Sequence, residues 1–140
     1  MVEEQSNKIG HLNMIQEIIN RMGNNSFSLK QWAVGIMIAI YAFAGENSHK
    51  AVVVTIIPLV VFWILDSYYL MIERKFRGLY DEVRKKEEKI IDFNMNFNSI
   101  KVNMSNISNY CLLKVAFSKT IFPFYLVCFV TTLIIYFIKF

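Results

Sequence analysis

The acidic residue Asp66 lies inside the otherwise uncharged apolar run 51–72. An ionisable side chain is costly in an apolar segment and by default indicates a functional site. Helical geometry places Asp66, Glu73 and Tyr80 on one face, with Tyr69 beside it. In a symmetric oligomer this polar stripe would line a pore or a gate with rings of charge. Asp66 could equally bind a partner helix, or reach the solvated headgroup level, and the sequence leaves these alternatives open.

Basic residues follow on the same segment: Arg74, Lys75, Arg77, Arg84, Lys85 and Lys86. Their simplest interpretation is membrane topology together with contact to anionic lipid headgroups. A sharper hypothesis is capture of a nucleotide-type anionic ligand, with Tyr80 available for stacking. No glycine-rich phosphate-binding loop accompanies them.

The remaining residues contain no pattern that predicts enzyme activity. His11 and His49 are isolated, without a second ligand at metal-binding spacing. Cys111 and Cys128 are expected at different depths, which argues against a disulfide. No hydrolase or metalloprotease motif occurs. We therefore predict a protein that is not an enzyme and has no metal site and no cofactor.

Long apolar runs dominate the chain of 140 residues, which is 55% hydrophobic and only 19% charged. This pattern predicts an all-α membrane protein with a single domain. The three expected transmembrane helices cover residues 27–45, 51–72 and 121–138.

The distribution of cations predicts the orientation of these spans. The connection 46–50 is short and forces the first two spans into a tight antiparallel hairpin. Residues 73–120 hold ten Lys or Arg residues and the first 30 residues hold three more. By the positive-inside rule, the N-terminus and residues 73–120 are cytoplasmic.

Two further helical patterns lie in the predicted cytoplasmic part. Residues 1–26 form an amphipathic helix that we expect to stop at residues 23–26, where Gly23 is followed by two asparagines and a serine. The second span is expected to continue as one helix to about Asp92. An Asn-rich connection then leads to the third span.

A heptad seam runs along the extended second helix, formed by Phe76, Leu79, Val83, Ile90, Phe93, Phe97 and Ile100. It can pack on the N-terminal helix of its own chain, or on copies of itself. We expect both contacts, in a homo-oligomer.

Several stretches carry a resemblance to known proteins. They include residues 11–22 and 25–32, and the most specific is 62–84, with Phe62-Trp63, Leu65-Asp66, Tyr68-Tyr69-Leu70, Glu73-Arg74, Phe76-Arg77, Leu79-Tyr80-Asp81 and Val83-Arg84. With them the chain resembles a family of small bacterial multi-span membrane proteins. Its two-span hairpin and long cytoplasmic helix are loosely similar to the SLATT-type transmembrane effectors of anti-phage defence systems. The third span departs from their two-helix pattern.

The resemblance implies a multi-pass protein of the bacterial inner membrane that forms pores on receiving a signal. We therefore expect a homo-oligomeric channel or pore-like effector, gated at its basic cytoplasmic region. The alternative is a non-conducting membrane anchor or accessory subunit. The expected partners are membrane lipid, copies of the same chain, and either a soluble defence protein or a nucleotide-type anionic ligand.

Overall fold

The computed structural model describes residues 2–43, 48–87, 93–96 and 111–138. Within these ranges the chain is all-helical, with α1 (Val2–Phe43), α2 (Ser48–Lys85), the short α3 (Leu112–Ala116) and α4 (Phe122–Ile138), and without strands. Helices α1 and α2 are long and apolar enough to cross a membrane, and α4 is a shorter apolar helix. The all-helical prediction is therefore confirmed for the described residues.

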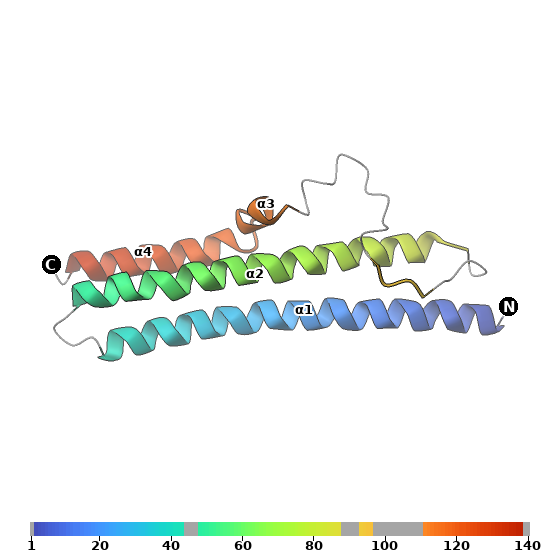
Figure 1. Cartoon of the computed structure of the whole chain (residues 1–140), viewed down its shortest axis with the longest axis horizontal. Coiled ribbons are helices and arrows are strands. Elements are labelled where there is room, and N and C mark those ends of the chain that lie inside the picture. The colour runs from blue at the N-terminus through green and yellow to red at the C-terminus, as the bar shows by residue number, and fades with distance from the viewer. Residues whose placement is uncertain (1, 44–47, 88–92, 97–110, 139–140) are drawn as a thin grey trace.

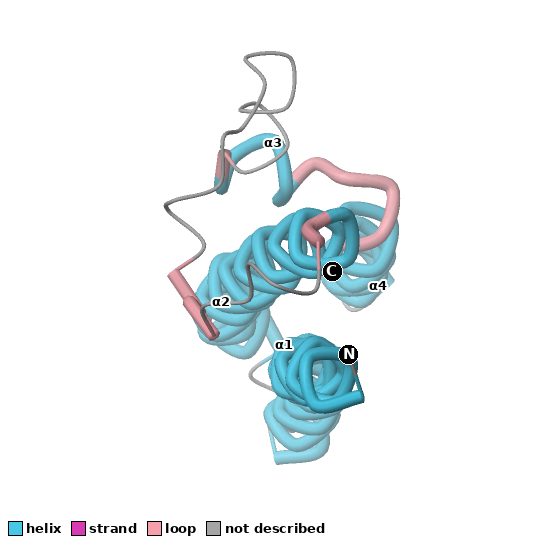
Figure 2. The backbone as a smooth tube through the Cα atoms, turned by 90° about the vertical axis from the view of Figure 1, so that its right-hand side faces the viewer, coloured by secondary structure: helices cyan, strands magenta, loops and turns pink. Residues whose placement is uncertain are grey.

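Helix α2 lies between α1 and α4 (Figure 1). Helices α1 and α2 run antiparallel over most of their length, while α4 lies along the N-terminal half of α2 only. Figure 2 shows α3 projecting to one side of the bundle. Two parts result. The stalk comprises residues 2–25 and 67–85, which extend beyond α4, and the apolar half comprises residues 27–43, 51–65 and α4.

The predicted helix end at residues 23–26 is wrong, because α1 is continuous through them. Glycine costs about 1 kcal/mol in a helix interior, which packing along a neighbouring helix readily offsets. At Gly23, a Cβ atom would lie 3.8 Å from Glu73 Oε2, so α2 packs directly beside this position. Three residues further on, the hydroxyl group of Ser26 donates a hydrogen bond to Asp66 of α2.

Helix α2 ends at Lys85, earlier than the predicted end at about Asp92, a residue that lies outside the described ranges. The chain bends at Lys86, whose carbonyl oxygen accepts a hydrogen bond from Lys8 Nζ at 2.8 Å. A side chain of α1 thus satisfies a backbone acceptor just beyond the end of α2. The antiparallel helix pair is closed at this end by that contact.

The first part of the heptad seam packs inside the chain. Phe76, Leu79 and Val83 are buried against Ile15 and Ile19 of α1, so one of the two predicted partners is confirmed. Phe93 does not continue the seam in a helix; it has a left-handed backbone (φ 51°), and its ring lies 5.4 Å from that of the buried His11. The remaining seam residues, Ile90, Phe97 and Ile100, lie outside the described residues.

The apolar half has a small core and a large apolar surface. Its buried cluster contains Ala33, Leu59, Val115, Ile121, Tyr125 and Cys128. Residues 31–43, 51–65 and 122–138 contain no Lys, Arg, Asp or Glu. The outward-facing large side chains include Ile38, Val53, Ile57, Val127, Leu133, Ile134 and Phe137. The molecule therefore presents an apolar belt on three helices, with the charged stalk on one side of it.

Candidate functional site

Asp66 is fully buried where the stalk meets the apolar half. The hydroxyl group of Ser26 donates a hydrogen bond to Asp66 Oδ1. The ammonium group of Lys30 lies 2.6 Å from Asp66 Oδ2 and 2.9 Å from Ser26 Oγ. Both carboxylate oxygens are thus bound by α1 of the same chain. The sequence left open whether Asp66 faces a pore, a partner helix or the headgroups. In the described chain Asp66 binds a partner helix, and this helix is α1 of the same chain.

The spacing of Ser26 and Lys30 explains how α1 reaches one carboxylate with two side chains. Residues four apart lie one above the other on a helix face. Because α1 does not break at Gly23–Ser26, this face stays aligned with α2. Lys30 keeps about one fifth of its side-chain surface exposed, while Asp66 has none.

Helix α4 contributes a third group to this site. Tyr125 is buried, and its hydroxyl group lies close enough to Asp66 for an electrostatic interaction, without meeting the geometry of a hydrogen bond. Asp66 therefore stands between α1, which binds it, and α4, which offers a further hydroxyl group. Ser26, Lys30, Asp66 and Tyr125 are named here the Asp66 cluster.

Asp66, Glu73 and Tyr80 lie on one side of α2, as the polar stripe predicts, and this side faces α1. Glu73 is buried, and its Oε1 binds Arg77 at 2.9 Å from Nε and 2.7 Å from Nη2. Tyr80 is half-buried and packs against the stalk core. Tyr69 is also half-buried, with its ring 6.0 Å from that of Tyr68. Within the described chain, the two acids of the stripe are neutralised by Lys30 and Arg77.

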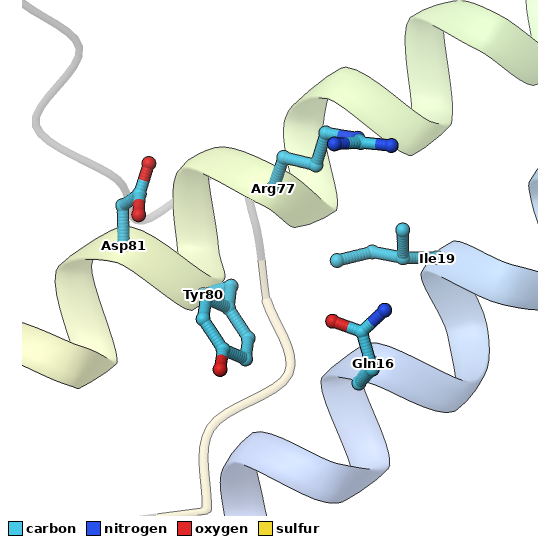
Figure 3. A pocket seen from close by; sticks show the side chains of 5 residues that line it. All are labelled: Gln16, Ile19, Arg77, Tyr80 and Asp81. Atoms are coloured by element: carbon cyan, nitrogen blue, oxygen red, sulfur yellow. The ribbon is translucent and has the colours of Figure 1, made fainter.

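A pocket of about 240 Å³ opens on the stalk between α1 and α2. Figure 3 shows its lining residues: Gln16 and Ile19 from α1, and Arg77, Tyr80 and Asp81 from α2. An aromatic ring, an amide and a guanidinium group thus come together on the side of α2 that faces α1. The carboxylate of Asp81 lowers the net positive charge there.

The basic residues predicted to form one patch on α2 have different surroundings in the structure. Arg77 binds Glu73, and Arg84 Nη2 lies 3.6 Å from Asp81 Oδ1. Lys85 is exposed, while Arg74, Lys75 and Lys86 are half-buried. Among these residues, only Arg77 lines the stalk pocket.

Sequence reasoning missed three members of the Asp66 cluster. None of Ser26, Lys30 and Tyr125 is singled out from the sequence as a partner of Asp66. One signal in the sequence could have identified two of them. Ser26 and Lys30 are four residues apart, and the predicted hairpin packs their helix against the helix of Asp66. The described residues hold no cluster of three or more metal-ligating side chains, and Cys111 and Cys128 are free.

Comparison with known proteins gave no relative: no protein-family model, curated protein or solved structure matches the chain.

Proposed function

We propose that the chain is a multi-pass protein of the bacterial inner membrane, with α1, α2 and α4 as its three spans and the stalk in the cytoplasm. The apolar belt on these helices supports this assignment. Lys30 and Asp66 mark its cytoplasmic edge, because the uncharged stretches of all three helices lie on one side of them. Stretches of this length span about 20–26 Å at 1.5 Å per residue, shorter than the core of a typical bilayer of about 30 Å. Local thinning of the bilayer and polar side chains that reach to the headgroups accommodate such a difference.

This placement moves the membrane boundary on α2. The sequence predicts a span to residue 72, whereas we propose a boundary near residue 65, which is supported by the charges of the Asp66 cluster. Asp66 then lies at the edge of the hydrocarbon, where an ion pair is much less costly than at the bilayer centre. The cationic stalk faces the cytoplasm, in agreement with the positive-inside rule.

We further propose that the protein is a non-enzymatic, homo-oligomeric, channel-like effector. The buried Asp66 cluster is the observation that carries this proposal. It holds polar groups at the membrane edge, and their contacts join α1 to α2. In the closed state these groups are turned into the protomer. Opening requires α1 to separate from α2 at this level, so that Asp66 and Glu73 can line a path between copies.

The stalk pocket is the proposed place where a signal acts. Its residues come from both helices that must separate, so a ligand bound there can change their relative position. A role in anti-phage defence rests on the family resemblance alone.

Membrane depolarisation in a bacterial host tests the channel proposal. A voltage-sensitive dye is read while the full chain is expressed from a graded promoter. We expect Lys30→Met to depolarise cells at lower expression than the original chain, because it removes one of the two contacts that hold Asp66 to α1. Asp66→Asn combined with Glu73→Gln should reduce depolarisation, because it removes the charges of the path. Glu17→Gln, at an exposed position of α1 that does not line the stalk pocket, is the control; equal depolarisation by all four chains would refute the mechanism.

The alternative function, a non-conducting anchor that recruits a soluble partner through its stalk, is favoured by one observation. Both acids of the polar stripe are already paired within one chain. A stoichiometric soluble partner that co-purifies with the protein, combined with absence of conductance in planar bilayers, would favour this alternative.

A further inference from the structure

Helix α3 is attached to the apolar half by one face. Val115 is fully buried in the apolar core. The indole N–H of Trp63 donates a hydrogen bond to the carbonyl oxygen of Ala116 at 3.1 Å. The ring of Phe117 meets the Trp63 indole edge-on, with 5.4 Å between centroids. These contacts fix the orientation of α3 and of the turn that follows it.

The rest of the surface of this segment is apolar and exposed, including the part of the Phe117 ring that Trp63 and Phe122 do not cover. Leu113 and Phe117 lie four residues apart, hence on the same side of the helix, and retain 69% and 61% of their surface exposed. Lys114 and Lys119 flank them and are exposed as well. Residues 111–120 contain no acidic side chain. Residues 111–120 therefore combine large apolar groups with two lysines and no acid.

The height of α3 on the molecule places this surface at the edge of the apolar belt. Trp63 precedes Asp66 by three residues, or about 5 Å along α2. Lys114 and Lys119 therefore lie near the level of the Lys30–Asp66 pair. At such a boundary, large apolar groups favour the region between lipid headgroups, and lysines favour lipid phosphates.

We propose that residues 112–119 form a lipid-binding collar, which inserts Leu113 and Phe117 among the headgroups and binds the phosphates of anionic phospholipids through Lys114 and Lys119. The inference rests on the membrane location proposed above. Charge complementarity selects anionic phospholipid as the occupant, since the collar is continuous with the apolar belt and carries no negative charge. The collar differs from the predicted lipid contacts at residues 74–86, which lie further along the stalk.

The exposed thiol of Cys111 provides a probe beside the collar. The full chain with Cys128→Ala is labelled at Cys111 with an environment-sensitive fluorophore and reconstituted into vesicles of phosphatidylcholine, with or without an equal amount of phosphatidylglycerol. We expect strong quenching by nitroxide on lipid headgroups, and weak quenching by nitroxide deep in the acyl chains. Phosphatidylglycerol should lower quenching by aqueous acrylamide, an uncharged quencher that the vesicle charge does not repel, about twofold, and high salt should reverse that effect.

Two double variants test the lysines. Lys114→Gln with Lys119→Gln should abolish the effect of phosphatidylglycerol, whereas Lys85→Gln with Lys86→Gln on the stalk should preserve it. Acrylamide quenching that is equal in both lipid mixtures, or a phosphatidylglycerol effect that survives the first pair of substitutions, would overturn the proposal.

A probe at Leu133→Cys on the outer face of α4, in a chain with Cys111→Ser and Cys128→Ala, separates this failure from failure of the membrane assignment. If this probe reports deep lipid while the Cys111 probe reports water, only the collar is wrong. If both report water, the membrane location itself is wrong.

Discussion

The ion pair between Lys30 and Asp66 makes the sharpest stability prediction. Replacing Lys30 with Met keeps the length of the side chain and removes its charge, leaving the buried Asp66 carboxylate with Ser26 as its nearby donor. Removing one partner of a buried ion pair costs about 3–5 kcal/mol. Because Lys30 is about one fifth exposed and water screens its charge, we expect a cost just below this range, about 2–3 kcal/mol.

A double-mutant cycle isolates the interaction. Lys30→Met, Asp66→Asn and the double variant are unfolded reversibly in mixed detergent micelles, and helicity is followed by circular dichroism. We expect a coupling energy of about 2 kcal/mol, since the double variant no longer buries an unpaired charge. The matched control is the exposed pair Arg84–Asp81 at 3.6 Å, with an expected coupling below about 1 kcal/mol. Additive effects of Lys30→Met and Asp66→Asn would refute a buried ion pair between α1 and α2.

Three further substitutions test the helix packing by the same unfolding measurement. Ser26→Ala should cost about 1–2 kcal/mol through the lost hydrogen bond to Asp66, whereas Ser28→Ala at an exposed position should change little; equal effects would contradict the assigned contact. Leu79→Ala should cost about 2–4 kcal/mol, because Leu79 is buried between α1 and α2, and a loss below 1 kcal/mol would place the seam elsewhere. Gly23→Ala should stabilise the chain by up to about 1 kcal/mol, because the added methyl group meets Glu73 at an ordinary contact distance; a clear loss would indicate that α1 is interrupted there.

The sequence predicts the helices better than their ends. The uncharged runs identify the apolar segments of α1, α2 and α4, because such composition depends on every residue of a segment. The predicted stop at Gly23 rests on local signals, and packing against α2 overrides them. The predicted extension of α2 to Asp92 rests on the periodicity of the seam residues. Such a pattern maintains a helix only where its apolar face packs against a neighbouring element.

The candidate site was predicted only in part, for a related reason. Asp66 is conspicuous because it is an acid in an apolar run, and its position needs no knowledge of the fold. Its partner Ser26 is 40 residues away in the chain, and the register of α1 against α2 decides whether the two side chains meet. That register depends on α1 being continuous. The error at Gly23 therefore concealed the roles of Ser26 and Lys30 as well.

The packing of the seam constrains how several copies can assemble. Phe76, Leu79 and Val83 contact α1 of the same chain, so these side chains are not available to a second copy while the stalk is closed. Closed protomers that associate must therefore use the apolar half or other surfaces of the stalk. Separation of α1 from α2 would expose the seam and the Asp66 cluster together, because both face α1. In the proposed effector, one movement of α1 thus makes available both the charges that line a path and the apolar seam that joins the copies around it.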